Sequence, residues 1–205
     1  DLLVSGIEVP GRSLRLPIVG ALSSVFPEGS GFVPVALRQK LVVLGGTLAL
    51  GWAGNVVAAS TFVRELAERH AKAPFDDGTL QALIDESTSR LRAENVQLIG
   101  WLTVPGGSMG FQVGATTFDT EQYGRVHAIG TGADGLRRLL TTELARVSLA
   151  GNQAPADADQ SAGYAMAAAA SLAGLELATE NSLLNYYGGG YEVVALRGGS
   201  FQKLG

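Results

Sequence analysis

The chain has 205 residues, of which 46% are hydrophobic and 17% are charged, and its formal net charge is −4. This composition is too apolar for a disordered segment and sufficient for a packed core, and the lack of any block of lysine and arginine disfavours a nucleic-acid partner. With no cysteine and only two histidines, disulfides and thiolate metal sites are excluded and a histidine-built zinc site is disfavoured, so we expect no metal and no organic cofactor.

The first quarter of the chain predicts extended structure. Turn-forming residues separate runs that are rich in Val, Leu and Ile, and Gly45-Gly46 is typical of a tight hairpin turn. A kink is expected at Pro34. Several runs are apolar on both faces, which indicates strands covered on two sides. The expected strands are residues 2–9, 14–22, 32–44 and 47–53.

Two amphipathic helices are expected next, and together they would form one layer. Asn55 is the expected N-cap of the first helix, which ends before Pro74. The second helix is expected over residues 79–93, with the acidic pair Asp76-Asp77 as its cap. Apolar spacing predicts the inward-facing residues, which are Val56, Ala59, Phe62, Val63 and Leu66 in the first helix and Leu80, Leu83, Ile84, Ser87 and Leu91 in the second.

The rest of the chain again predicts strands followed by helices. Three strands, two helices and a closing hairpin are expected, and the third helix would turn Leu136, Leu139, Leu140 and Leu144 inward. The predicted fold class is α+β, a single domain over residues 1–205 built as a four-layer αββα sandwich, in which two helical layers enclose two antiparallel sheets. The expected ranges are strands at 96–104, 108–117 and 125–129, a helix at 160–180, and hairpin strands at 191–196 and 201–204.

The longest apolar stretch does not predict a membrane span. Residues 162–178 are mostly alanine and include Glu176, so insertion into a bilayer would be weakly driven and a buried core helix is the better interpretation. The chain also starts without the charged and apolar regions of a secretory signal. We therefore expect a cytoplasmic protein with no membrane partner.

A lone lysine marks the most informative region. Lys40 is the only charged residue between Arg38 and Arg64, and an apolar strand, the double-glycine hairpin, LALGWAG and an amphipathic helix follow it. This succession resembles the core of the proteasome β-subunit and its bacterial HslV relatives, which are N-terminal nucleophile (Ntn) hydrolases. The hairpin at 96–113 and the glycine-rich segments at 128–140 (AIGTGADGLRRLL) and 185–196 (NYYGGGYEVVAL) resemble further parts of that family, in the same order.

The resemblance implies a particular chemistry. In that family a Thr, Ser or Cys at the mature N-terminus attacks an amide carbonyl, with its own α-amino group, of pKa about 8, as the base. A nearby lysine lowers the pKa of the nucleophile, an aspartate orients the lysine, and a glycine N–H stabilises the oxyanion. The resemblance implies Lys40 for the lysine and Gly54, fourteen residues later, for the oxyanion glycine.

Other positions depart from the family pattern. The residue sixteen positions before the lysine is Ser24, which accepts a hydrogen bond but carries no charge. Ungapped spacing places the nucleophile on Glu8, and Asp1 takes that place only with a seven-residue insertion. Neither side chain is a competent nucleophile in this scheme, so the nucleophile is not present in this chain. Thr131 stands where the family often has a serine.

Each of these residues also has a structural interpretation. Lys40 could be an edge-strand lysine whose ammonium reaches water, and Gly54 could be a glycine that a tight turn needs. His70, at a helix end, and His127, in a strand, are interpreted as structural or solvated.

Two functions follow from the resemblance. The mismatches favour a degenerate, non-catalytic ring subunit that keeps the fold and the assembly surfaces. The alternative is an active threonine- or serine-type peptidase or amidase, with a peptide or amide substrate, whose nucleophile lies at or just upstream of residue 1. In both cases the resemblance implies a homo-oligomeric ring with contacts from the helix pair, including Phe62.

Overall fold

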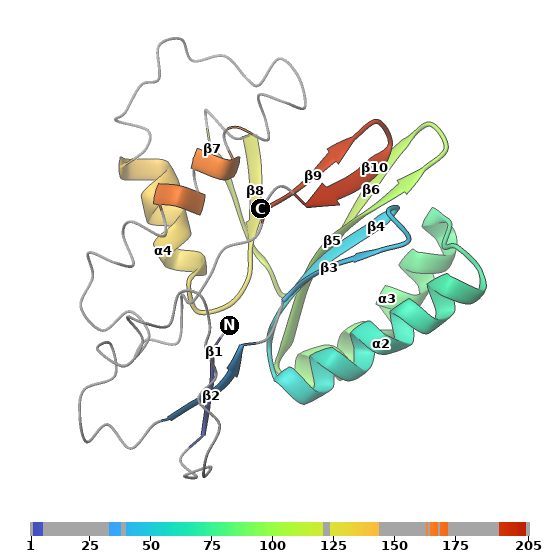
Figure 1. The fold of residues 1–205 in the computed structure, drawn as a ribbon, viewed down its shortest axis with the longest axis horizontal. Coiled ribbons are helices and arrows are strands. Elements are labelled where there is room, and N and C mark those ends of the chain that lie inside the picture. The colour runs from blue at the N-terminus through green and yellow to red at the C-terminus, as the bar shows by residue number, and fades with distance from the viewer. Residues whose placement is uncertain are drawn as a thin grey trace. The chain divides into compact units, whose positions relative to one another are not determined.

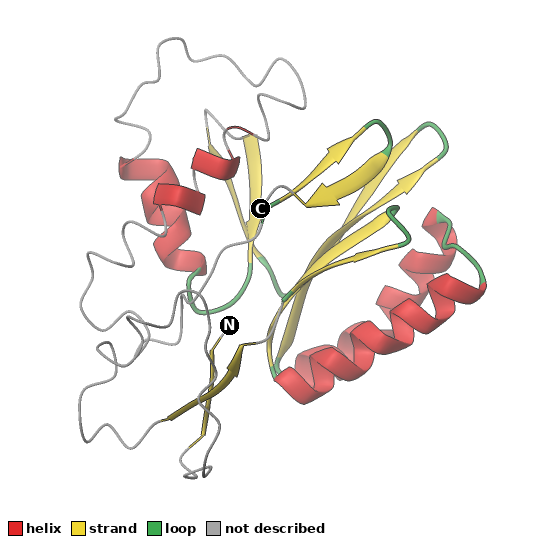
Figure 2. Cartoon of the chain, viewed as in Figure 1, coloured by secondary structure: helices red, strands yellow, loops and turns green. Residues whose placement is uncertain are grey.

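The structure, a computed structural model, describes residues 2–5, 33–37, 40–120, 124–143, 163, 165–167, 169–171 and 193–203. It is a mixed α+β protein with helices and antiparallel sheets (Figures 1 and 2). The chain divides into two units, of which one comprises residues 1–39 and 166–191 and the other residues 40–165 and 192–205. The predicted strand at 14–22 lies outside the described residues.

The first unit contains one described strand pair. Strand β1 (Leu2–Ser5) pairs with β2 (Val33–Leu37) in antiparallel fashion, with an irregularity in the register between Leu3 and Val4. The sequence predicted one extended run over residues 32–44. That prediction is wrong in detail, because β2 pairs with β1 whereas the following strand, β3, pairs with β4.

The second unit is built on a four-stranded antiparallel sheet. Its strands lie in the order β3 (Leu41–Leu44), β4 (Leu48–Gly54), β5 (Val96–Val104) and β6 (Gly107–Val113). The predicted turn between β3 and β4 is confirmed, since Gly45 and Gly46 have φ values of +57° and +73° that suit glycine. The predicted strand at 108–117 instead breaks at Gly114, whose φ is +69°. The residues after the break, 116–120, pair with residues 124–128.

The predicted helix pair is confirmed. Helix α2 (Val56–Lys72) begins after Asn55, whose Oδ1 accepts hydrogen bonds from the amides of Val57 and Ala58 at 3.1 and 3.3 Å. Helix α3 (Asp77–Ala93) begins two residues earlier than expected, because Asp76 is its N-cap and accepts from the Thr79 amide at 2.7 Å. Both caps satisfy backbone donors that a helix start leaves unpaired.

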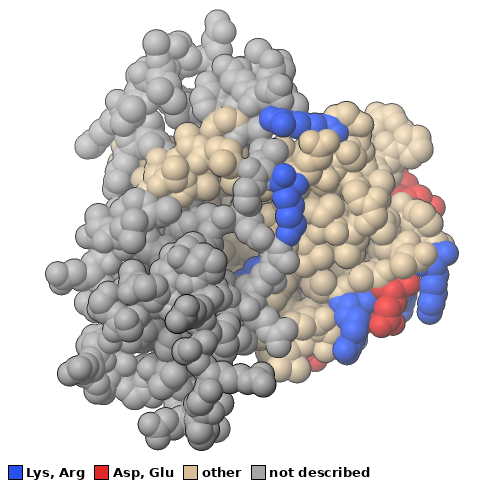
Figure 3. All heavy atoms as spheres, viewed as in Figure 1, with Lys and Arg blue, Asp and Glu red and all other residues tan. Residues whose placement is uncertain are grey.

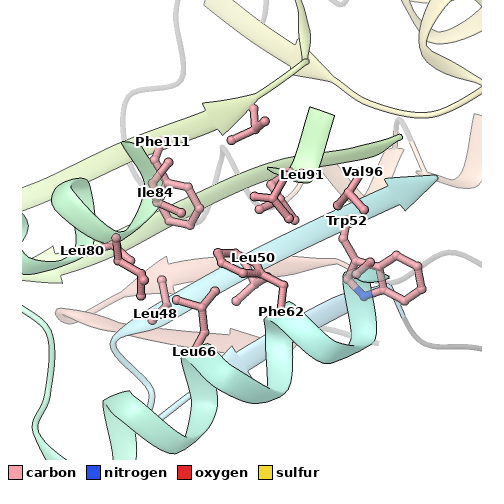
Figure 4. Close-up of a cluster of buried hydrophobic side chains, with 14 of the residues drawn as sticks. Leu48, Leu50, Trp52, Phe62, Leu66, Leu80, Ile84, Leu91, Val96 and Phe111 are labelled. Carbon is pink, nitrogen blue, oxygen red and sulfur yellow. The ribbon is translucent and has the colours of Figure 1, made fainter. Parts of the chain in front are cut away.

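The main hydrophobic core lies between this helix pair and one face of the sheet (Figure 4). Alternate residues of β4 point toward the helices, as the period of a strand requires. All five inward residues predicted for α3 are buried, as are Ala59, Phe62 and Leu66 of α2. Phe62 is only 1% exposed, so the expectation that it contributes to subunit contacts is wrong. The strand residues of the core include Leu48, Leu50, Trp52, Val96, Leu98, Leu102, Phe111 and Val113.

Shorter elements complete the second unit. A hairpin of β7 (Thr116–Thr120) and β8 (Gly124–Ala128) leads to α4 (Ala133–Arg138) and a π-helical turn (Leu139–Glu143). In the predicted third helix Leu139 and Leu140 are buried, Leu136 is half-buried, and Leu144 lies outside the described residues. The closing hairpin of β9 (Val194–Arg197) and β10 (Ser200–Lys203) is confirmed.

The outer side of the helix pair is charged, with both signs mixed. Arg64, Glu65, Glu68 and Arg69 project from α2 away from the core, and Glu65 forms ion pairs with Arg69 at 2.7 Å and with Arg90 of α3 at 3.4 Å. In Figure 3 positive and negative side chains lie close together on the part of the surface where Figure 1 shows α2. Among the described helices, none has the length and apolarity that crossing a membrane would need.

Candidate functional site

Lys40 directly precedes β3 and extends the pairing of that strand with β4. Its carbonyl oxygen accepts a hydrogen bond from the amide of Trp52 at 3.0 Å. Since Leu41 pairs with Gly51, Lys40 lies opposite Trp52. The ammonium is over the indole, with Nζ 5.4 Å from the ring centroid, which is a cation–π arrangement.

The surroundings of this lysine are partly desolvated. Lys40 is half-buried, and desolvation lowers its pKa from the ordinary lysine value, because a low-dielectric environment disfavours the charged ammonium. The electron-rich face of the Trp52 ring offsets part of that cost. Lys40 is therefore not a fully solvated surface lysine, although it adjoins the outer strand of the described four-stranded sheet.

Gly54 ends β4 in a conformation that requires glycine. Its φ is +91°, and a Cβ at this position would overlap the backbone carbonyl of Asn95. The amide of Asn55 donates to that same carbonyl oxygen at 3.1 Å. The close approach lets the chain leave the sheet and enter α2, so packing alone accounts for a glycine here.

Thr131 follows Gly130 in the segment between β8 and α4. The Gly130 amide donates to Oε1 of Gln97 at 2.7 Å, and Nε2 of Gln97 donates to the Gly114 carbonyl at 3.0 Å. Gly130 also faces Ala53, since a Cβ added to it would lie 3.2 Å from the Ala53 Cβ. Ala53 immediately precedes Gly54. Thr131 itself is exposed.

The structure thus gathers three of the four predicted site residues at one end of the sheet. Lys40 and Gly54 lie at the open end of the β3–β4 hairpin, and the contact of Gly130 with Ala53 brings the Thr131 segment to the same end. Ser24, the fourth, lies outside the described residues, as do Asp1 and Glu8.

The three positions do not share one face of the sheet. Trp52 belongs to the cluster beneath the helices, and neighbouring residues of a strand point to opposite faces, so Ala53 points away from the helices. The ammonium of Lys40 lies over the Trp52 ring, on the side of the sheet that faces the helices. The Gly130–Thr131 segment instead contacts Ala53. The lysine and the threonine segment therefore approach the end of β4 from opposite sides.

Both histidines make specific contacts. His70, which is 6% exposed, lies within hydrogen-bond distance of Thr47 and Phe75, so its structural interpretation is confirmed. The half-buried His127 has Nδ1 2.9 Å from the Thr117 hydroxyl, and its ring is 6.3 Å from that of Trp101. In the part of the chain that the structure describes, no three or more His, Asp or Glu side chains are grouped so as to hold a metal ion.

Comparison with known proteins adds no relative. No family model, no curated protein and no solved structure matches this chain. The assignment of function therefore depends on the geometry and the sequence resemblance alone.

Proposed function

We propose that this chain is a degenerate relative of the proteasome β-subunit, with the αββα four-layer fold of the Ntn hydrolases, and that it acts as a non-catalytic subunit of a homo-oligomeric ring. The order of the described elements supports the fold. Four strands precede the helix pair, four strands follow it, and α4 and a closing hairpin come later, in the order that the resemblance implies.

The position of the Lys40 ammonium is the observation that carries the non-catalytic assignment. In the chemistry that the resemblance implies, the lysine acts through its positive charge on a neighbouring nucleophile. Here the ammonium lies over Trp52, a member of the core under the helices, and burial lowers the pKa of Lys40. These contacts support a structural role for Lys40, in which it stabilises the end of the β3–β4 hairpin.

One observation favours the alternative, an active threonine- or serine-type peptidase or amidase. Lys40 and Gly54, on one hairpin, and the segment of Thr131, much later in the sequence, lie at one end of the sheet, although on opposite sides of β4. Such a gathering would suit an active site if the nucleophile, at or just upstream of residue 1, entered at that end. The substrate would be a peptide or another amide.

A mechanism-based label distinguishes the two functions. A peptide epoxyketone requires a hydroxyl and an α-amine on the same residue, so it reports an N-terminal Thr or Ser. We expect intact mass spectrometry of the natural protein, after incubation with this compound, to show no adduct.

A stoichiometric adduct that disappears in Lys40→Met would overturn the non-catalytic assignment. Methionine keeps an apolar side chain over Trp52 while it removes the charge. Lys72→Met is the matched control, because Lys72 is an exposed lysine in the last turn of α2 and its loss should leave any labelling unchanged.

A further inference from the structure

His70 is a buried ionisable side chain for which the proposed function has no use. It lies in the last turn of α2 and is 6% exposed. Its Nδ1 is 3.1 Å from the amide nitrogen of Phe75, in the loop between α2 and α3, and its Nε2 is 3.0 Å from the hydroxyl of Thr47, in the β3–β4 turn. One imidazole therefore bridges a helix loop and a strand turn.

The partners of the ring define its protonation state. The amide of Phe75 can only donate, so Nδ1 must accept and carries no proton. In a neutral imidazole the proton is then on Nε2, which donates to the Thr47 hydroxyl. A proton added at Nδ1 would point at the Phe75 N–H, and two donors cannot share a hydrogen bond.

The ring is enclosed at this position, since His70 is 6% exposed. A Cβ on Gly45 would lie 3.1 Å from Nε2, and the rings of His70 and Phe75 have centroids 5.2 Å apart. Because both ring nitrogens already have partners and the side chain is buried, a proton on Nδ1 would face the Phe75 amide instead of water or an acceptor.

We propose that His70 is a pH-sensitive clasp that holds the α2–α3 loop against the β3–β4 turn when neutral and releases it when Nδ1 is protonated.

The charges around the ring support this assignment. The residues that contact it from the turn and the loop, Gly45, Thr47 and Phe75, are uncharged. Of the ionisable neighbours in sequence, Glu68 is exposed and projects away from the core, Arg69 pairs with Glu65 at the surface, and Asp76 holds the Thr79 amide. Lys72, two residues along α2, is exposed and positive, so it gives the imidazolium no stabilising partner.

The direction of the pH effect follows from burial, which lowers the pKa of His70. When the contact between the α2–α3 loop and the β3–β4 turn is open, the imidazole would regain an ordinary pKa of about 6.5. The contribution of the clasp is then complete above about pH 6.5 and is lost as the pH falls from there through the lowered pKa of the closed state, because the open state binds the proton more tightly.

Hydrogen exchange of the Phe75 amide tests the proposal in the natural protein. After correction for intrinsic exchange rates, lowering the pH from about 7.5 to about 5.5 should increase opening of this amide by up to about tenfold, since pH 5.5 is one unit below the ordinary pKa of an imidazole in the open state. In His70→Gln, whose amide offers an acceptor and a donor but does not titrate, the increase should vanish. His127→Gln, which removes the other histidine, should retain it.

An equal increase in wild type and His70→Gln would overturn the clasp. A nitrogen-15 NMR spectrum provides a second measurement that needs no variant. It should show a neutral ring protonated on Nε2 near neutral pH, with a pKa below the ordinary histidine value, and a proton on Nδ1 would equally overturn the proposal.

Discussion

Gly54 and Gly106 have nearly the same backbone angle but different surroundings. Their φ values are +91° and +93°, and a Cβ would overlap the Asn95 carbonyl at Gly54 but meet nothing within 4 Å at Gly106. In Gly106→Ala, we expect a loss of about 1–2 kcal/mol of unfolding free energy from backbone strain alone. Gly54→Ala should lose about 1–3 kcal/mol more because of the overlap, as measured by urea denaturation. Equal losses would show that the overlap relaxes at no cost.

Residue identities alone indicated which positions were unusual, but not what surrounds them. The isolation of Lys40 among apolar residues predicted a special environment, and the structure gives it one. Its partner could not be predicted, because Trp52 lies opposite only through the register of β3 and β4, and register depends on the whole sheet. The role of Gln97, which joins Gly130 to Gly114, gave no signal in the sequence.

At the scale of the element, two neighbouring residues of α2 provide a direct comparison. Leu66 is fully buried, whereas Glu65 lies at the surface between Arg69 and Arg90. We expect Leu66→Ala to lower the free energy of unfolding by about 2–5 kcal/mol, because it leaves a cavity. Glu65→Ala should cost less than about 1 kcal/mol, since exposed ion pairs contribute little. A larger effect of Glu65→Ala in chemical denaturation would contradict this ranking.

Helices were more predictable than strands for a physical reason. Asn55 and Asp76 are local caps, and apolar residues at helical spacing fix the inward face, so α2 and α3 were found within two residues of their observed ends. Strand ends depend on partners that are distant in sequence. Hence one strand was expected over residues 32–44, whereas the structure has two strands there that belong to different sheets. The strand expected at 108–117 is likewise interrupted at Gly114.

At the scale of the whole molecule, the sequence predicted the α+β class and the order of the elements. The assembly remains a proposal. We expect light scattering of the natural protein at micromolar concentration to show a closed oligomer, and a monomer would contradict the ring. The resemblance implies contacts from the helix pair, and Arg64 lies on the exposed side of α2, so Arg64→Glu should weaken assembly. Arg125→Glu, an exposed charge reversal on β8, is the control that should not.

The placement of the main core has a consequence for synthesis of the protein. Every buried member of the cluster between α2, α3 and the sheet lies between Leu48 and Val113, and short connections join the elements in that stretch. Pairing of β3 with β4 and of β5 with β6 closes short loops and costs little chain entropy, whereas β4 and β5 pair across 42 to 54 residues, from Gly54–Val96 to Leu48–Leu102. All residues of this core are therefore present once residue 113 has left the ribosome, and we expect the core to form before synthesis of the chain is finished.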